Sequence, residues 1–387
     1  MNDFVWYNPT EIIFGKGKHR EVGMYVKKYA NRILLHYGGG SVKKTGTLDV
    51  VKQSLQDAGV EYVELGGVKP NPRVSLVREG IEICRREKLN FILAVGGGSV
   101  IDSAKGIAVG VPYEGDVWEL YATEKQPVEI LPVGVVLTIP AAGTESGDGS
   151  VLNNEETQDK RSCCSPVFYP KFAILNPELC YTLPRRQIAA GGIDMLAHVM
   201  ERYFVPNEPT LLTDQLCEGT MRTIIDCIPR VMEDPTNYDL WAEVMWCGTV
   251  AHNGFIGKGR LDDWASHEME HQLSALYDMI HGEGLAIMFP AWMEYVRDAH
   301  PWRFVDFAVK VFQIDPENKS QEEIISQGIQ ALKDFYHRLG VATTMTEAGI
   351  ENPDIERMTE QASQGAPLGN FVKLHKNDIR NIYNLAK

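Results

Sequence analysis

No apolar stretch in this 387-residue sequence is long enough to cross a lipid bilayer. The best candidate covers residues 133–140, whereas a spanning helix needs about 18 consecutive apolar residues. The beginning of the sequence, Met1 to Phe4, has no basic segment followed by an apolar one, so no secretory signal peptide is expected. We therefore expect a cytoplasmic protein that does not associate with membranes.

Cysteine and basic residues are also scarce. The seven cysteines are an odd number and none shows the CxxC spacing, which favours a reducing compartment over a disulfide framework. The 52 acidic residues outnumber the 38 basic ones, which gives a formal charge of −14. Because an acidic surface repels phosphate backbones, we expect no nucleic-acid partner.

The first 180 residues alternate short apolar runs with helical patterns. At about 150 residues per domain, the length favours two domains. Because strand–helix–strand units connect parallel strands, the alternation predicts an α/β domain over residues 1–180, with helices on both faces of a parallel sheet. The expected strands cover residues 33–37, 62–65, 91–95, 133–139 and 172–175, and the helices between them include residues 41–58 and 74–88.

The remaining residues, 181–387, predict an all-helical second domain. Few runs of β-branched residues interrupt this half, and proline or glycine marks many of its helix boundaries. The expected helices cover residues 185–203, 211–232, 239–256, 262–277, 283–296, 302–311 and 322–339.

Two glycine clusters follow predicted strands in the first half. A strand, glycines and a helix N-terminus together let backbone N–H groups hold a phosphate, so the pair favours diphosphate binding. Neither cluster is the dinucleotide fingerprint GxGxxG, and the P-loop pattern is missing, so two plain tight turns are the alternative. The clusters are Gly38-Gly39-Gly40-Ser41 and Gly96-Gly97-Gly98-Ser99, and Asp102 follows the second in the first turn of a helical pattern.

The helical half carries a constellation of aspartate and histidine. Asp194 and His198 are four residues apart and project from one helical face. His267, His271 and His281 follow further along the chain. A surface ion pair and structural histidines are the plain alternatives. The combined interpretation is one divalent metal, Fe²⁺, Zn²⁺ or Co²⁺, held by Asp194, His198, His267 and His281.

A segment of this constellation also matches the string HExxH. In a metallopeptidase, His267 and His271 would bind zinc and Glu268 would be the base. A metallopeptidase has no need of two phosphate-binding turns, however, and it leaves the Asp194–His198 pair unexplained. A non-catalytic binding module explains the set of metal-binding residues even less well.

Taken together, these motifs resemble the iron-dependent (group III) alcohol dehydrogenases, most of all the butanol dehydrogenase and broad aldehyde reductase branch. The resemblance runs from Pro9–Gly17 to Trp292–Tyr295 and beyond, and it rests on the joint order of motifs that are weak singly. These motifs are the two Gly-Gly-Gly-Ser turns, the segment from Thr138 to Glu145, Asp194-xxx-His198, His267-xxx-His271 and His281-Gly282.

The resemblance implies a Rossmann-like N-terminal half, a helical C-terminal half, a nicotinamide dinucleotide in the cleft between them, and a homodimer. It implies reversible hydride transfer between NAD(P)H and a primary alcohol/aldehyde pair. It assigns the metal to the four residues named above and places His271 near the nicotinamide, where we expect it to relay a proton. The cofactor contacts that it implies fall on Gly97, Gly98, Ser99, Asp102, Thr138, Thr144 and Lys160, with Asn71 near the adenosine.

Some residues depart from the family pattern or bear on cofactor choice. Ala142 stands where threonine is usual, so one hydroxyl contact to the cofactor is expected to be lost, and Cys163-Cys164 has no counterpart to interpret. Gly38–Ser41 offers no acidic residue to bond a ribose 2′-hydroxyl, and Lys43 follows closely, so the sequence favours NADP(H) over NAD(H). Glycerol dehydrogenase-like or dehydroquinate synthase-like chemistry on the same fold is the main alternative.

Overall fold

The computed structural model describes residues 1–123, 125–206, 209–364 and 367–387. It divides into two compact units. The sheet unit comprises Tyr7–Leu183 and Asp234–Asn253, and the helical unit comprises Met1–Trp6, Pro184–Glu233 and Gly254–Lys387. The division into domains at residue 180 stays a prediction, and the compact units group residues 234–253 with the sheet.

A six-stranded sheet forms the centre of the sheet unit, and all of its neighbouring strands are parallel. In three of these strands, β4, β5 and β8, every residue is buried. This burial explains why they appear in the sequence as continuous apolar runs without alternation. The order of strands is β1 (Glu11–Phe14), β8 (Phe172–Leu175), β5 (Val133–Leu137), β4 (Ile92–Gly96), β2 (Arg32–Gly38) and β3 (Glu61–Val68). A separate antiparallel pair, β6 (Gly149–Asn154) and β7 (Asp159–Cys164), was not expected from the sequence.

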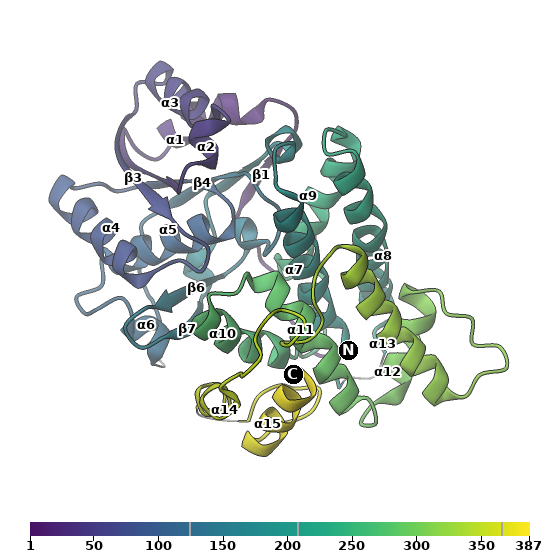
Figure 1. The fold of residues 1–387 in the computed structure, drawn as a ribbon. Coiled ribbons are helices and arrows are strands. Elements are labelled where there is room, and N and C mark those ends of the chain that lie inside the picture. Colours follow the sequence, from purple (N-terminus) through teal and green to yellow (C-terminus); the bar gives the residue numbers. More distant parts are fainter. Residues whose placement is uncertain (124, 207–208, 365–366) are drawn as a thin grey trace. The chain divides into compact units, whose positions relative to one another are not determined.

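Helices α4 (Val74–Glu87) and α5 (Gly98–Gly110) pack closely on each other in the sheet unit (Figure 1). A Cβ atom at Gly80 would lie 2.4 Å from Cδ1 of Ile107, and one at Gly110 would lie 2.2 Å from Cδ1 of Ile81. The two helices can approach this closely because glycine stands at both points. The other helices of this unit are α1 (Val22–Lys27), α2 (Ser41–Lys44), α3 (Thr47–Asp57), α6 (Glu119–Ala122) and α9 (Tyr238–His252), with short helical turns η1 (Lys18–Glu21), η2 (Thr144–Ser146), η3 (Pro166–Phe168) and η4 (Pro177–Cys180).

Helix α7 (Arg185–Tyr203) is the most buried long helix of the helical unit, and it packs on α8 (Leu211–Glu233) and α11 (His281–Val296). The α/β fold class with a helical C-terminal region is confirmed. Within the ranges that the structure describes, no helix is both long and apolar enough to cross a membrane. The remaining elements are α10 (Ala265–Tyr277), α12 (Pro301–Asp306), η5 (Phe307–Val311), α13 (Gln321–Arg338), α14 (Ile355–Ala362) and α15 (Lys376–Leu385).

Candidate functional site

The turn between β4 and α5 joins a buried strand to the N-terminus of a helix through glycines. Gly97 is extended at φ −92° and ψ −169°, and α5 begins at Gly98. The N–H groups of Val100 and Ile101 are bonded back to the carbonyl of Gly97. Residues 97–99 are only half-buried, whereas α5 is buried from Val100 onward. The helix N-terminus therefore meets solvent at the predicted glycines, where backbone N–H groups and the helix dipole favour an anion.

A buried network holds the loop with Thr144 against the first two turns of α5. The hydroxyl of Thr144 donates to Oδ1 of Asp102 over 2.7 Å. Nζ of Lys105 donates to the Thr144 hydroxyl over 2.9 Å and to the carbonyl oxygens of Thr144, Gly147 and Gly149 over 2.8–2.9 Å. The structure thus brings two predicted cofactor residues, Asp102 and Thr144, into direct contact.

Burial changes the acidity of both charged groups in this network. It raises the pKa of Asp102 to about 6, although the cation of Lys105 and the hydroxyl of Thr144 oppose the change. It lowers the pKa of Lys105 to about 8, although the carboxylate of Asp102 opposes the change. The charge of Lys160, another predicted cofactor residue, also acts on Asp102.

The turn after β2 is less suited to holding a phosphate. Gly40 has φ +153°, and α2, the helix that follows, is only four residues long. Nζ of Lys43 lies 4.9 Å from the centre of the Tyr37 ring, and the Tyr37 hydroxyl donates to Glu64. Because β2 and β4 are neighbours in the sheet, both glycine turns lie at the same edge, and a Cβ at Gly38 would be 3.6 Å from Val100.

The structure also places the other predicted cofactor residues of the sheet unit. Asn71 is buried with a left-handed backbone, at φ +53°. The Thr138 N–H donates to the carbonyl of Gly96, and Lys160 is buried on β7 opposite Asn153.

The structure also places Glu145, Cys163 and Cys164, whose roles could not be assigned from the sequence. Glu145 is buried and accepts from the hydroxyl of Thr249 on α9, and burial raises its pKa. Cys163 is buried and Cys164 is exposed, and burial raises the pKa of Cys163 to about 11. Buried Cys163 therefore does not have the character of a reactive thiolate.

Three of the four predicted metal ligands converge within the helical unit. Atoms of Asp194, His267 and His281 that can bind a metal all lie within 4.8 Å of one another. Nε2 of His198 lies 3.4 Å from Oδ1 of Asp194, and its ring centre is 4.6 Å from that of His267. Nε2 of His281 lies 3.7 Å from the same Asp194 oxygen. One carboxylate and three imidazoles at this spacing fit a divalent transition metal.

Two buried glutamates, Glu201 and Glu270, lie behind these histidines. Nδ1 of His267 donates to Oε1 of Glu201 over 2.7 Å, and Nδ1 of His281 donates to Glu270. The Nε2 atom on the opposite edge of each ring is then the one placed to coordinate a metal. Burial raises the pKa of Glu201 to about 8.

His271 does not share a metal-binding group with His267 among the described residues. Its possible ligand atom instead clusters with those of Glu270 and His281. Nδ1 of His271 lies 3.8 Å from the carboxylate of Glu268, a side chain that is 42% exposed. The geometry therefore does not support the metallopeptidase alternative, which needs His267 and His271 on one ion.

Three further residues, Lys105, Glu201 and Glu270, were not predicted from the sequence, although each stands at helical spacing from a predicted site residue. Glu201 lies on α7 at i+7 from Asp194, in line with His198 at i+4. Glu270 lies at i+3 from His267 on α10. Lys105 lies at i+3 from Asp102 on α5, but charged residues at helical spacing are common on exposed faces, so the pattern alone does not indicate burial.

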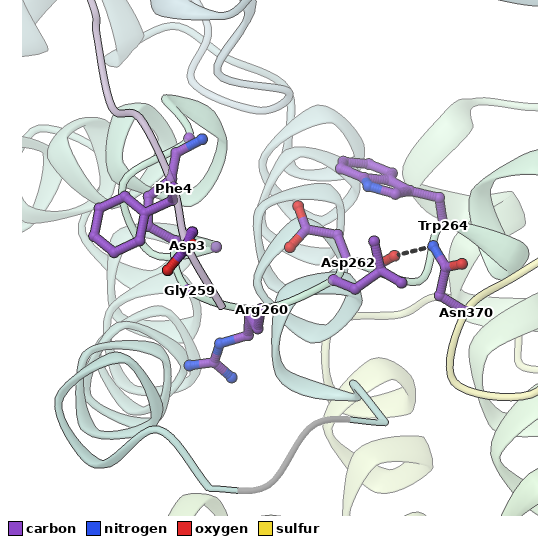
Figure 2. Close-up of a pocket in the computed structure, with 11 residues that line it drawn as sticks. Asp3, Phe4, Gly259, Arg260, Asp262, Trp264 and Asn370 are labelled. Atoms are coloured by element: carbon purple, nitrogen blue, oxygen red, sulfur yellow. Dashed lines mark hydrogen bonds between the residues drawn. The ribbon is translucent and has the colours of Figure 1, made fainter. Parts of the chain in front are cut away.

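A pocket of about 360 Å³ opens elsewhere in the helical unit, beside the loop that precedes α10 (Figure 2). In it, the side-chain amide of Asn370 donates to the carbonyl of Asp262 over 2.7 Å. None of the predicted site residues is among the described residues that line it. These are Asp3, Phe4, Gly254, Gly257, Lys258, Gly259, Arg260, Leu261, Asp262, Trp264 and Asn370.

Comparison with protein-family models matches almost the whole chain. Residues 9–177 match the iron-containing alcohol dehydrogenase model, and residues 188–386 match the C-terminal model of the Fe-containing alcohol dehydrogenase family. The chain is 41% identical over 382 residues to a probable NADH-dependent butanol dehydrogenase of Bacillus subtilis, a match that covers 99% of both chains. It is 36% identical to the NADPH-dependent aldehyde reductase YqhD of Escherichia coli, over the full length of both chains.

A solved structure agrees with these matches. The NADH-dependent butanol dehydrogenase A of Thermotoga maritima superimposes with a TM-score of 0.96 at 41% identity, covering 100% of this chain and 99% of that one. The chain thus belongs to the iron-containing alcohol dehydrogenase family, in its butanol dehydrogenase and aldehyde reductase branch, and is an NAD(P)H-dependent oxidoreductase of alcohols and aldehydes.

Proposed function

We propose that this enzyme reduces aldehydes to primary alcohols, with a divalent metal held by Asp194, His198, His267 and His281. The observation that carries the proposal is the convergence of these side chains in a buried region of the helical unit. Iron is the metal that the family name gives, and Zn²⁺ or Co²⁺ would suit the same donors. When bound, the cation supplies a Lewis acid for the substrate oxygen and the nicotinamide supplies a hydride.

The chain's own residues have two tasks besides holding the metal. The first is cofactor binding, which we assign to the turn with Gly97, Gly98 and Ser99. This turn leads into the half-buried N-terminus of α5, whose backbone N–H groups are available to a diphosphate. Lys105 and Asp102 hold Thr144 beside this turn through hydrogen bonds of the protein itself.

The second task is delivery of a proton, because aldehyde, NAD(P)H and one H⁺ together give alcohol and NAD(P)⁺. We assign this task to His271, which lies on α10 one turn after His267. Its ring centre is 5.8 Å from that of His281, and its Nδ1 is 3.8 Å from the exposed carboxylate of Glu268. A water molecule between these two groups would let His271 exchange protons with solvent through Glu268 while its ring stays buried.

We propose that NADP(H) is preferred over NAD(H). The support is local: no acidic residue stands at Gly38–Ser41, and the ammonium of Lys43 lies over the Tyr37 ring at this edge of the sheet. The relatives include both an NADH-dependent butanol dehydrogenase and an NADPH-dependent reductase. The ratio of kcat/KM for NADPH and NADH decides the question, and a strong preference for NADH would contradict the proposal.

We also propose a cytoplasmic homodimer. The support is that the apolar side chains of Phe4, Val5 and Trp6 in the helical unit are exposed, and a second copy of the chain would cover them. Light scattering at several protein concentrations gives the molar mass in solution. A strictly monomeric mass would contradict this proposal and leave the proposed reaction unaffected.

The function is tested with His267→Ala on protein of measured metal content. We expect this variant to lose both the metal and aldehyde-dependent oxidation of NAD(P)H. His337→Ala is the control, since His337 is half-exposed and pairs with Glu347, and it should keep both. Full activity in a metal-free preparation would overturn the proposal. Oxidation of glycerol at its secondary hydroxyl, without activity on aldehydes, would favour the glycerol dehydrogenase-like alternative, and a reaction with no net change in NAD(P)H would favour the dehydroquinate synthase-like one.

A further inference from the structure

Two carboxylates that the proposed reaction does not use are completely enclosed beside the metal histidines. Glu201 on α7 is 1% exposed and Glu270 on α10 is 0% exposed. Burying an ionised carboxylate costs several kcal/mol unless hydrogen bonds and a nearby cation compensate. Both residues therefore need a physical reason to be where they are.

The hydrogen bonds of Glu201 give a first reason. Besides Nδ1 of His267, it accepts from the backbone N–H of Trp264 over 2.6 Å and of His267 over 3.2 Å. Trp264 has a left-handed backbone with φ +70°, an uncommon conformation for a bulky residue. Glu201 thus fixes the start of α10 and the ring of His267 at the same time, and local strain is tolerated to achieve it.

Glu270 has the equivalent role for the next metal histidine. Its carboxylate accepts from Nδ1 of His281 at the start of α11 and from the hydroxyl of Ser274 on its own helix. Helix α7 therefore supports a histidine of α10, and α10 supports a histidine of α11. The metal-binding residues of three helices are connected by this chain of carboxylate–imidazole pairs.

The charges explain why such a costly arrangement is kept. Asp194, Glu201 and Glu270 are three buried carboxylates in one region of the helical unit. A divalent cation on the Nε2 side of the two imidazoles offsets this negative charge, whereas an imidazole without a carboxylate behind it is a weaker ligand. The buried acids therefore fit a metal-loaded protein better than a metal-free one.

We propose that Glu201 and Glu270 are positioning residues that fix the ring orientation and tautomer of His267 and His281 and so set the affinity of the metal site. This inference rests on the proposed metal ligands and goes beyond them. It assigns to two glutamates a role that can be measured without any turnover assay.

The test uses the full-length Glu201→Gln and Glu270→Gln variants. Glutamine keeps the shape and one acceptor oxygen but removes the negative charge. We expect each variant to bind Zn²⁺ about 10–100-fold more weakly, measured by competition with a chelator. Thermal denaturation of the metal-free variants shows whether each one is folded.

Glu218→Gln is the matched control. Glu218 is also a buried glutamate of the helical unit, but it accepts from the hydroxyl of Tyr203 on α7 and contacts none of the metal histidines in the described structure. We expect this variant to keep the affinity for Zn²⁺. A lower affinity in Glu218→Gln equal to that in Glu201→Gln would show a general effect of unfolding and would overturn the inference.

The spectrum of bound Co²⁺ gives a second measurement that a purely structural role would not change. We expect the visible bands to shift in Glu201→Gln and Glu270→Gln, because the ligand rings turn. If one variant does not fold, the other still tests the inference, since the two glutamates contact different histidines. Parental affinity and an unshifted Co²⁺ spectrum in either folded variant would overturn it. Metal binding that survives Asp194→Ala and His267→Ala would instead overturn the proposed ligand set.

Discussion

The ammonium group of Lys105 donates to the hydroxyl of Thr144, and that hydroxyl donates in turn to the carboxylate of Asp102. Lys105 is 0% exposed, and its ammonium group also donates to the carbonyl oxygens of Gly147 and Gly149. A single cation thus holds the loop after β5 against α5, the helix that begins at the glycine turn after β4. The carbonyl oxygens of this loop lie in a buried region, so they depend on the ammonium group of Lys105 as their hydrogen-bond donor.

Replacing Lys105 with Met should remove this support. We expect the free energy of unfolding to fall by about 2–4 kcal/mol, because several buried acceptors lose their donor and Asp102 loses its cation. The affinity for NAD(P)H, measured by the fluorescence of the bound cofactor, should fall as well. Lys52→Met is the control, since Lys52 forms an ion pair with Glu64 near the surface and should cost less than about 1 kcal/mol. A Lys105 variant as stable as this control would contradict the assignment.

Buried His36 should make the sheet unit sensitive to acid. Its Nδ1 donates to the carbonyl of Leu65 and its Nε2 accepts from the hydroxyl of Ser103, each over 2.8 Å. Burial lowers its pKa from 6.5 to about 4. The unfolded chain therefore takes up a proton as the pH falls through about 6.5, while the folded chain does not. The stability from neutral His36 is fully present above that pH and is lost as the pH falls toward 4.

We expect this residue to reduce the free energy of unfolding by about 2 kcal/mol between pH 7.5 and 5. Urea denaturation at several pH values measures the loss. His36→Gln, which can bond both partners but does not titrate, should show a correspondingly smaller loss over the same range. An unchanged pH dependence in this variant would assign the acid sensitivity to other groups.

Much of the fold could be predicted because the buried residues of the central strands and long helices form recognisable apolar patterns in the sequence. Strands such as β4 and β5 are short apolar runs, and the helical spacing around Asp194 and His198 anticipates α7. The predicted helix over residues 41–58 breaks into α2 and α3 because Gly46 adopts φ +75° between them. The pair β6–β7 was missed because a segment such as Asp159-Lys160-Arg161-Ser162 has none of the apolar alternation typical of a strand.

The residues around the site were harder to predict for a different reason. A histidine at metal-ligand spacing carries a local signal, but a lysine or glutamate is read as a solvated side chain until its burial is known. The roles of Lys105 and Glu201 are seen only in the structure. There, Lys105 bonds Thr144, and Glu201 bonds the ring of His267. These contacts join residues 39 and 66 positions apart, so no local pattern contains them.

The turn after β4 contains two glycines that we expect to respond differently to alanine. A Cβ at Gly97 would lie 2.0 Å from Cγ2 of Ile139, so Gly97→Ala should cost about 1–3 kcal/mol of stability through crowding. A Cβ at Gly98 would meet only ordinary contacts, 3.6 Å from Ala142 and 3.7 Å from Thr144. Gly98→Ala should therefore fold normally.

Cofactor binding separates the two variants further. The methyl group of Gly98→Ala would stand where the diphosphate approaches the backbone, so the Kd for NAD(P)H should rise at least about tenfold, or about 1.4 kcal/mol. Thermal midpoints and cofactor titrations on both variants give the comparison. Unchanged cofactor affinity in folded Gly98→Ala would place the diphosphate away from this turn.

Asp214 on α8 should be among the most sensitive positions of the helical unit. Its Oδ1 accepts from Nη1 of Arg260 over 2.9 Å and from Nη1 of Arg303 over 2.7 Å, and both arginine side chains are fully buried. Its Oδ2 accepts from the N–H of Thr210. One carboxylate therefore partly neutralises the charge of two guanidinium groups that water does not reach.

Asp214→Asn keeps the shape of the side chain and leaves both guanidinium groups without this anion. We expect the free energy of unfolding to fall by about 3–5 kcal/mol, the cost of an uncompensated buried charge. Asp226→Asn on the same helix is the control, because its pair with Arg230 is exposed and should contribute less than about 1 kcal/mol. Urea denaturation of both variants gives the difference directly. Equal stability of the two would mean that Arg260 and Arg303 are stabilised by their ring and backbone surroundings, such as the Tyr203 and Trp302 rings against Arg303, and not by the carboxylate.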